Sequence, residues 1–307
     1  MGIGQRLEIP PREWAWNMGV IDCHVHVNPL WEMRPEARQL IEGERGDIPQ
    51  LERMLRDPEE FLAYLDRVGV SRAVLVNYVS PEVVGYTEKA NEFVAQYVRG
   101  HEERLIAVGS PDMRLRDPPR GTLRRLVELG IRGIKLHPAH QLLWPNAYRP
   151  EEGGFAPLRE FYEACEEFRL PLIVHTGTSI FPGARTKYAQ PMLLEDVATD
   201  FPDLPIVLAH GGRPLWMDEA MFLTRRFRQV YLELSGVPPS RLLQYFPNLE
   251  RLASKVLFGS DWPGPGVKDI GENLRAFRES GLSADAVHQI LEVNPERVFV
   301  PPAHAPS

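Results

Sequence analysis

Four short segments of the chain each end an apolar run with a side chain that can bind a metal ion. The segments are DCHVHV at 22–27, VHTG at 174–177, AHGG at 209–212 and FGSDWP at 258–263. In the first segment, the period of two along a strand places Asp22, His24 and His26 on one face, so two imidazoles can reach one ion. A lone His-x-His is common in strands that bind no metal, and the metal interpretation therefore depends on the other three segments.

Apolar runs of strand length recur along the chain, with helical patterns between them. The runs are VIDCHVHV from 20, RAVLVNY from 72, RLIAVGS from 104, IRGIKLHP from 131, PLIVHTG from 171, PIVLAHGG from 205, VYLELSG from 230 and VLFGSDWP from 256. Eight strands that alternate with helices predict an α/β fold, a (β/α)8 TIM barrel that forms a single domain over residues 1–307. An open doubly wound sheet would usually carry a G-x-G-x-x-G turn, which the sequence lacks.

In a TIM barrel the catalytic groups lie at the carboxyl ends of the strands, and every candidate ligand falls there. In the fourth strand, Ile134 and Leu136 suit the side that faces the helices. Alternation along the strand then directs Lys135 and His137 into the barrel. The fifth, sixth and eighth strands likewise end with the inward residues His175, His210 and Asp261. The pattern predicts one site at the barrel rim.

Two segments lie outside the regular alternation. Residues 1–19 form an N-terminal extension with Trp14 and Trp16, which we expect to pack across the barrel. Residues of about 28–58 form a long rim loop between the first strand and its helix. This loop is either a lid or a solvated charged excursion without a role, because long loops are tolerated at little free-energy cost.

Composition and charge restrict the partners. With 43% hydrophobic and 25% charged residues, the 307-residue chain can bury a large core, and its net charge of −7 argues against nucleic acid or an anionic membrane as a partner. No apolar stretch approaches a membrane span and the N-terminus lacks a signal-peptide core, so a cytoplasmic location is expected. Cys23 and Cys165 are expected to be buried free thiols.

With His-x-His on the first strand, His on the fifth and sixth, and Asp on the eighth, the chain resembles the amidohydrolase superfamily. It is most similar to the amidohydrolase-related group that includes aminocarboxymuconate-semialdehyde decarboxylase and related hydratases and lactonases. The likeness extends from Val20 to Phe299 and includes the terminal NPERVF. It implies a metal-dependent enzyme with a small-molecule substrate, and pairing into a homodimer.

The resemblance also implies a ligand set and a catalytic acid/base. One divalent ion, zinc or alternatively manganese, would be held by His24, His26, His175 and Asp261, and His210 would be the catalytic acid/base. The chemistry is consistent, because three neutral imidazoles and a carboxylate suit a borderline cation whose open position lets water ionise near neutral pH. His210 would then orient or deprotonate that water, and Asp261 would also accept its proton.

The fourth strand raises the question of a second metal ion. Binuclear amidohydrolases carry on this strand a carbamylated lysine that bridges two ions, and Lys135 and His137 are the corresponding residue types here. The Asp-x-His-x-His start and the GSDWP ending resemble the mononuclear group, so one ion is favoured. Lys135 would then remain an ammonium that pairs with Asp22 or with a substrate carboxylate, and His137 would contact the ligands or the substrate.

Three functions remain open from the sequence. The first is hydrolysis of an amide, ester or lactone, and the second is non-oxidative decarboxylation of an unsaturated or aromatic acid by the same residues. The third is a metal-binding scaffold without catalysis. Arg213 and Arg185, close to catalytic strand ends, are candidates to bind a substrate carboxylate, with loop bracing as the alternative. His140 is expected at the surface or in a loop.

Overall fold

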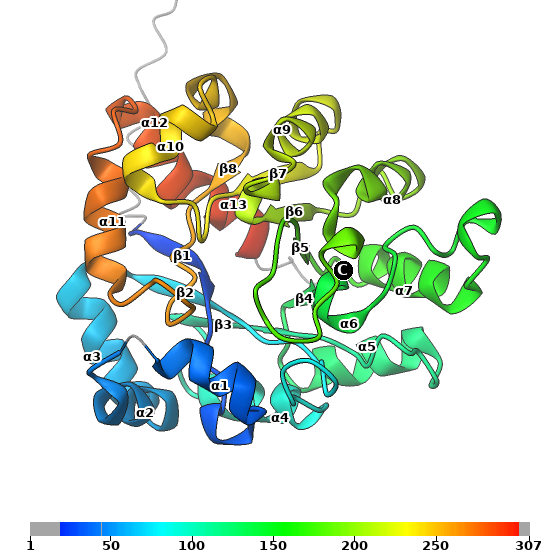
Figure 1. Ribbon diagram of the computed structural model, residues 1–307, viewed down its shortest axis with the longest axis horizontal. Coiled ribbons are helices and arrows are strands. Elements are labelled where there is room, and N and C mark those ends of the chain that lie inside the picture. Colours follow the sequence, from blue (N-terminus) through cyan, green and yellow to red (C-terminus); the bar gives the residue numbers. More distant parts are fainter. Residues whose placement is uncertain (1–18, 44, 301–307) are drawn as a thin grey trace, which may run out of the picture.

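The computed structural model describes residues 19–43 and 45–300, so the predicted packing of Trp14 and Trp16 lies outside the described residues. Eight parallel strands pair in chain order and curve into a barrel, with the helices outside it (Figure 1). The strands are β1 Ile21–Val25, β2 Arg72–Val76, β3 Leu105–Gly109, β4 Gly133–Leu136, β5 Leu172–His175, β6 Ile206–Ala209, β7 Val230–Glu233 and β8 Val256–Leu257. The predicted TIM barrel and its eight strands are confirmed.

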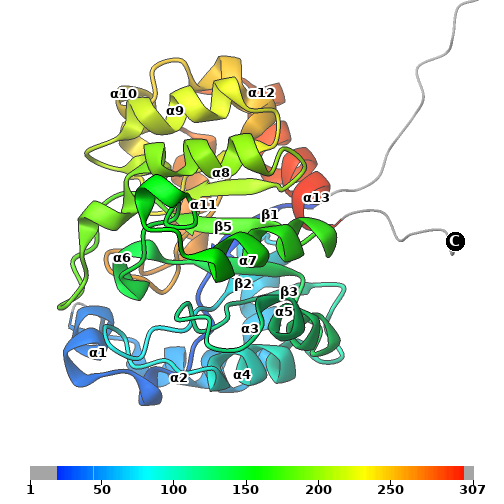
Figure 2. The ribbon, with the colours of Figure 1, turned by 90° about the vertical axis from the view of Figure 1, so that its right-hand side faces the viewer.

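The helices cover the outside of the barrel, as the turned view in Figure 2 shows. They are α1 Pro35–Glu42, α2 Ile48–Arg56, α3 Pro58–Val68, α4 Lys89–Val98, α5 Pro119–Glu128, α6 Pro138–Gln141, α7 Ala156–Glu167, α8 Leu194–Asp200, α9 Met217–Arg226, α10 Leu242–Tyr245, α11 Ile270–Arg278, α12 Ala284–His288 and α13 Asn294–Phe299. Over residues 19–43 and 45–300, none of them combines the length and apolar character needed to span a bilayer.

Local chemistry sets where these helices begin and end. The Asp57 side chain accepts a hydrogen bond from the amide of Glu59 at the start of α3. The same helix ends at Gly69, whose φ of 75° is in the left-handed region that glycine adopts without a steric penalty. The helix therefore stops where the chain turns to enter β2.

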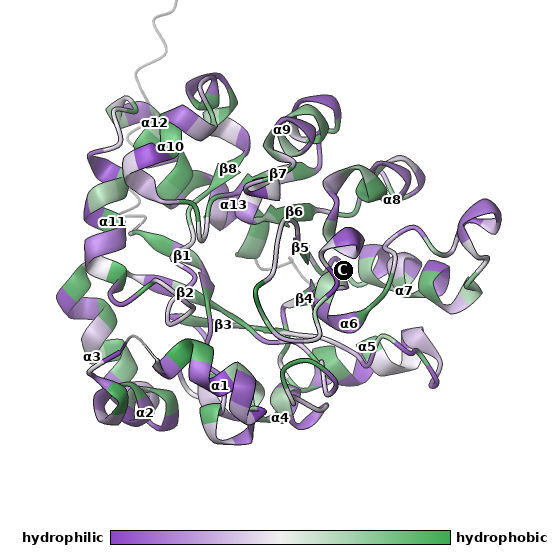
Figure 3. Cartoon of the chain, in the orientation of Figure 1, coloured by the Kyte–Doolittle hydropathy of each residue, from purple (hydrophilic) through white to green (hydrophobic). Residues whose placement is uncertain are grey.

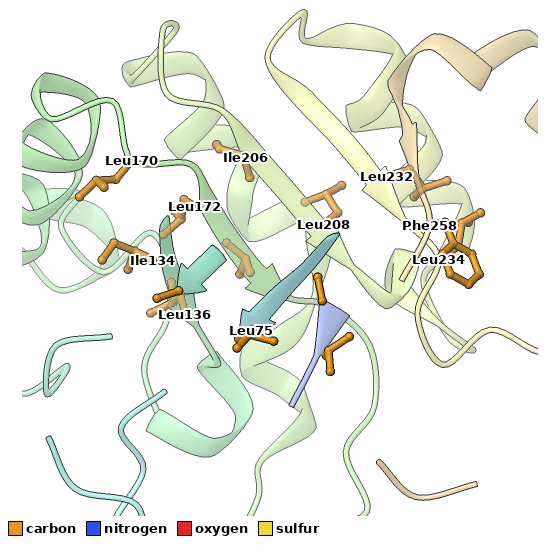
Figure 4. Close-up of a cluster of buried hydrophobic side chains, with 14 of the residues drawn as sticks. Leu75, Ile134, Leu136, Leu170, Leu172, Ile206, Leu208, Leu232, Leu234 and Phe258 are labelled. Carbon is orange, nitrogen blue, oxygen red and sulfur yellow. The ribbon is translucent and has the colours of Figure 1, made fainter. Parts of the chain in front are cut away.

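Alternating strand residues form the core between barrel and helices. Leucine, isoleucine and phenylalanine side chains from successive strands point to this layer (Figure 4), where burial of apolar surface stabilises the fold. In β4, Ile134 and Leu136 belong to this core, whereas Lys135 is 1% exposed and lines a pocket on the opposite side. The hydropathy of the chain in Figure 3 follows the same pattern, with polar residues on the outer helix faces. The predicted orientation of Lys135 is confirmed.

Hydrogen bonds between β1 and the segment after β8 close the barrel. The amide of Asp261 donates to the carbonyl of His24 over 2.9 Å, and the amide of His26 donates to the carbonyl of Trp262 over 2.7 Å. The amide of Cys23 donates to the carbonyl of Phe258 over 2.9 Å. Three candidate metal ligands are therefore fixed by the backbone bonds that close the sheet.

The segment of about 28–58 is helical rather than a long loop. It contains a short 3-10 helix, Leu30–Glu32, followed by α1 and α2, and it buries Leu51 and Leu55 completely. The guanidinium of Arg45 donates to the carbonyls of Val267 and Lys268 in the connection after β8. A solvated excursion is therefore excluded for these residues, because the segment packs on the barrel beside the site.

Candidate metal centre

Polar side chains from five strand ends meet in one pocket at the carboxyl end of the barrel. The pocket has a cavity volume of about 210 Å³. The strand-end residues that line it are His26, Lys135, His137, His175, His210 and Asp261. His24 lies behind them and is 1% exposed. The structure thus brings all the predicted ligands, the predicted acid/base and both inward residues of β4 into one site.

Two hydrogen-bond acceptors, one on His26 and one on Asp261, lie close together in the pocket. The Nδ1 atom of His26 lies 2.8 Å from the carbonyl oxygen of Val76, which can only accept, so Nδ1 carries the hydrogen. In the neutral ring, Nε2 then has a lone pair, and it lies 3.1 Å from Oδ1 of Asp261. Two acceptors at this distance require a positive charge, which is either a proton on the ring or a metal ion.

His24 is oriented by a buried carboxylate. Its Nδ1 atom lies 3.0 Å from Oε2 of Glu233, and its Nε2 atom lies 3.9 Å from Oδ1 of Asp261. Ser235 donates to Glu233 through both its amide and its hydroxyl, over 2.6 Å and 2.7 Å. A carboxylate behind an imidazole fixes the tautomer and directs the other ring nitrogen towards a metal ion. Nε2 of His24 therefore carries the lone pair, on the side of the ring that faces Asp261.

His210 has the same tautomer for a similar reason. Its Nδ1 atom lies 3.0 Å from the carbonyl oxygen of Ser235 and 2.9 Å from the hydroxyl of that residue, so Nδ1 carries the hydrogen. His210 and Asp261 have φ values of 66° and 68°, in the left-handed region that side chains disfavour. Such strain costs about 1–3 kcal/mol per residue and persists where the surrounding structure imposes it, often at functional sites.

The ligand atoms of His24, His210 and Asp261 lie within 4.8 Å of one another, and among the described residues this is the one group of three or more such side chains found that close together. Two of the four predicted ligands, His26 and His175, are outside this group, and the ring centroid of His175 lies 4.6 Å from that of His210. The Nε2 atom of His175 is buried and has no hydrogen-bond partner in the protein. Distance favours His210 as a ligand, because it belongs to this group, whereas the lack of a hydrogen-bond partner favours His175.

Burial keeps the imidazoles neutral and able to bind a cation. It lowers the pKa values of His24, His175 and His210 well below the usual value, and the nearby Lys135 charge acts in the same direction. For Asp261, burial opposes ionisation, but the hydrogen bond to His26 and the neighbouring charges prevail and lower the pKa of the carboxyl. Neutral imidazoles and an ionised carboxylate are the protonation states that metal binding requires.

Lys135 and His137 extend the site beyond the predicted ligands. The Nζ atom of Lys135 lies 3.4 Å from Nε2 of His24, and burial lowers the pKa of this ammonium to about 8, against the opposing charges of Glu233 and Asp261. The ring of His137 stacks on that of His175, with centroids 3.9 Å apart. Lys135 thus places a cation beside the ligands, and His137 fixes the plane of the His175 ring.

Sequence reasoning missed Glu233 and misplaced His140. Glu233 has the same parity in β7 as the inward residues, because Val230 and Leu232 belong to the helix-facing core, so alternation could have identified it. His140 was expected at the surface, but it lies in α6, is 1% exposed and lines the pocket. His140 lies four residues beyond the end of β4, so strand periodicity does not predict which way its side chain points.

Arg213 and Arg185 differ in position. Arg213 lines the pocket, and its buried Nε atom has no hydrogen-bond partner in the protein. A Cβ atom added at Gly236 would lie 2.6 Å from Nη2 of Arg213, so glycine leaves room for the guanidinium. Arg185 is exposed, lies outside the set of pocket-lining residues and donates to the carbonyls of Gly183 and Ala184. These contacts are those of the loop-bracing alternative.

Removal of the Glu233 carboxylate is expected to weaken metal binding. In Glu233→Ala, the ring of His24 loses the acceptor that fixes its tautomer, and we expect metal affinity to fall about 10–100-fold. Competition with a chelator measures this change. Tyr231→Phe, two residues earlier on the same face of β7, is the matched control and should leave the affinity unchanged. An unchanged affinity in folded Glu233→Ala would contradict the role given to Glu233.

The donor set fits a divalent cation. Nε2 of His26 and the carboxylate of Asp261 face each other as two acceptors, and Nε2 of His175 has no protein partner. Nε2 of His24 has the Lys135 ammonium 3.4 Å away. Nitrogen-rich sets with one carboxylate suit zinc, whereas manganese prefers oxygen ligands. The site is consistent with binding of a divalent metal ion.

A protein-family model described as amidohydrolase matches residues 21–300. No curated protein sequence matches the chain significantly. An uncharacterised TIM-barrel protein from Bordetella bronchiseptica is similar in structure, with a TM-score of 0.69 and 23% identity, over 92% of this chain and 98% of that chain.

Two further solved structures share the fold. A probable 2-pyrone-4,6-dicarboxylic acid hydrolase from Acinetobacter baumannii has a TM-score of 0.64 and 19% identity, over 92% of this chain and 100% of that chain. The 5-carboxyvanillate decarboxylase from Sphingomonas paucimobilis has a TM-score of 0.63 and 18% identity, over 92% of this chain and 99% of that chain. At these identities the likeness shows the fold alone.

Proposed function

Because the chain belongs to the amidohydrolase family, a family of enzymes, we propose that it is a metal-dependent hydrolase of a small carboxylate-bearing substrate. Members of the superfamily bind divalent metal ions. The observation that carries the proposal is the 3.1 Å approach of two acceptors, Nε2 of His26 and Oδ1 of Asp261, in the partly buried pocket at the barrel rim. A single zinc ion would satisfy both.

We propose His24, His26, His175 and Asp261 as the ligands and His210 as the acid/base. His175 is chosen as the fourth ligand because its buried Nε2 has no protein partner. His210 is connected through the Ser235 hydroxyl to Glu233, by contacts of 2.9 Å and 2.7 Å. Such a connection stabilises the imidazolium that forms when His210 takes up a proton.

When bound, a divalent cation polarises a substrate carbonyl and lowers the pKa of water in the site. The protein supplies the remaining functions. Nε2 of His210 faces the pocket with a free lone pair, so it can remove a proton from the attacking water and return it to the leaving group. Asp261 can accept the same proton, and its backbone bond to His24 holds its carboxylate beside that ring. Amides, esters and lactones are the bonds that this arrangement can cleave.

Two cations in the pocket define the charge of the substrate. The Arg213 guanidinium and the Lys135 ammonium both line the pocket. A guanidinium binds a carboxylate through two parallel hydrogen bonds, and the Arg213 guanidinium, which packs against Gly236 on its Nε and Nη2 side, lines the pocket. We therefore assign the substrate carboxylate to Arg213, with Lys135 nearer the reacting centre.

Truncation of Arg213 is expected to weaken substrate binding without loss of metal. In Arg213→Ala, KM for an acidic substrate should rise about 10–100-fold, since hydrogen bonds to charged groups contribute about 1.5–3 kcal/mol each. Metal content should be unchanged, because Arg213 lies outside the ligand set. Arg185→Ala, a matched loop arginine outside the pocket, should leave KM unchanged. An unaltered KM in Arg213→Ala would contradict the assignment.

A panel assay tests the reaction class. The zinc-loaded protein is incubated with lactones, esters, amides and unsaturated or aromatic carboxylic acids, and both hydrolysis and carbon dioxide release are followed. Similarity to a probable pyrone dicarboxylic acid hydrolase supports the first reaction, and similarity to a carboxyvanillate decarboxylase supports the alternative. Hydrolysis is the expected result. Carbon dioxide release without hydrolysis would make the protein a decarboxylase, and no turnover on any class would favour a binding scaffold.

A further inference from the structure

A second group of polar side chains lines the pocket outside the proposed ligand set. The hydroxyl of Tyr78 lies 2.9 Å from Nδ1 of His140, and Nε2 of the same ring lies 2.7 Å from the hydroxyl of Ser179. Tyr78 follows β2, His140 is in α6 and Ser179 follows β5, and all three line the pocket. Three rim segments therefore contribute to one hydrogen-bonded chain.

These three hydrogen-bonded side chains carry one more exchangeable hydrogen than their contacts with each other use. Burial lowers the pKa of His140 to about 3 and raises the pKa of Tyr78 above its usual value, so both side chains are neutral at pH 7. A phenol, a neutral imidazole and an alcohol together carry three exchangeable hydrogens. The two contacts with His140 use two of them. One hydroxyl hydrogen is left at either Tyr78 or Ser179.

The surroundings indicate which end carries the free hydrogen. The amide of Phe181 donates to the Ser179 hydroxyl over 3.3 Å, so this oxygen accepts from the protein on one side already. Tyr78 is 6% exposed, whereas Ser179 is half-buried. A donor without a partner costs more free energy when it is buried. Tyr78 therefore donates to His140, His140 donates to Ser179, and the Ser179 hydroxyl hydrogen is free for a ligand.

Contacts within the protein hold these three hydrogen-bonded side chains in place before any ligand binds. The ring of His140 stacks on His137 with centroids 3.5 Å apart, and its backbone carbonyl accepts from the Ser80 hydroxyl over 3.2 Å. The amide of Ser179 donates to the Thr186 hydroxyl over 3.5 Å. A donor fixed in this way binds a ligand without a large loss of conformational entropy.

We propose that Tyr78, His140 and Ser179 form a specificity subsite that donates one hydrogen bond, from Ser179, to an uncharged oxygen of the substrate. This rests on the proposed function and narrows its substrate class. The three side chains of the subsite are uncharged. A second substrate carboxylate bound here would therefore lose its hydration without a cation in contact with it. The other pocket walls combine the apolar side chains of Leu30, Met33, Ile41, Val84 and Phe181 with the polar ones of Asn28, Tyr86 and Thr178. The substrates are therefore carboxylic acids with an apolar body and a hydroxyl or carbonyl oxygen.

Binding of simple aromatic acids tests the subsite. The zinc-loaded protein is titrated calorimetrically with benzoate, 3-hydroxybenzoate, 4-hydroxybenzoate and isophthalate. At least one hydroxybenzoate should bind about 10-fold more tightly than benzoate, the size of one good hydrogen bond. In Ser179→Ala this preference should disappear while benzoate affinity stays the same. Isophthalate, with a second carboxylate, should bind no better than benzoate.

Matched variants separate the hydrogen bond from loop movement. Thr186→Val removes a contact from the same loop and should preserve the preference, whereas His140→Phe keeps the ring and should abolish it. The proposal is overturned if neither hydroxybenzoate exceeds benzoate, if the preference survives in Ser179→Ala, or if isophthalate binds as tightly as a hydroxybenzoate. Metal content is measured in parallel. Absence of metal with a retained preference would refute the proposed function and leave the subsite intact.

Discussion

Asp261→Asn should reduce turnover about 10³-fold and release the metal ion. The carboxylate supplies the negative charge of the ligand set, and its Oδ1 atom lies 3.1 Å from His26 and 3.9 Å from His24. Asparagine keeps the size of the side chain but replaces the anionic ligand with a neutral amide. Metal catalysis contributes several kcal/mol of transition-state stabilisation, and about 4 kcal/mol corresponds to a factor of 10³.

The measurement is kcat/KM together with metal content after dialysis. Asp269→Asn is the control, because it lies in the connection that follows β8 and caps α11, where asparagine is also an effective cap. It should retain metal and turnover. If Asp261→Asn kept the wild-type metal content and rate, Asp261 would not be a ligand.

His210→Asn should lower kcat about 10²–10⁴-fold while the metal ion stays bound. General acid–base catalysis contributes this range, and asparagine cannot take up a proton at neutral pH. The side chain of His210 reaches the pocket with Nε2, and Nδ1 is fixed by Ser235. KM should change little, because the carboxylate of the substrate is assigned to Arg213.

Elemental analysis distinguishes this role of His210 from that of a ligand. His288→Asn, a surface substitution in α12, should leave kcat and metal content unchanged. Loss of metal from His210→Asn would place His210 among the ligands, in line with its short distance from His24 and Asp261. A kcat equal to that of wild type would remove its catalytic role.

Strand periodicity predicted the parts of the site that lie on strands. The eight strands and the inward direction of Lys135 follow from alternation of apolar residues, because a buried parallel strand has one helix-facing and one inward side. Convergence of His175, His210 and Asp261 follows from the rule that strand ends meet at one rim. These features depend on local sequence.

Other features depend on contacts between distant segments. The 28–58 segment was predicted as a loop because of its length between strand and helix, but its amphipathic helix α2 buries Leu51 against the barrel. His140 became a pocket residue because α6 turns it towards Tyr78 and Ser179, which come from other strand ends. The choice between His175 and His210 as a ligand depends on where each ring nitrogen lies in the folded barrel, which the spacing of residues in the sequence cannot provide.

The number of metal ions per chain tests the central claim most directly. Purified protein is loaded with zinc, dialysed and analysed by mass spectrometry of the metal together with native mass spectrometry of the chain. We predict one zinc ion per chain in wild type, one in His210→Asn and none in His175→Ala. Two ions with a carbamyl group on Lys135, or an undiminished zinc content in His175→Ala, would contradict the mononuclear centre proposed here.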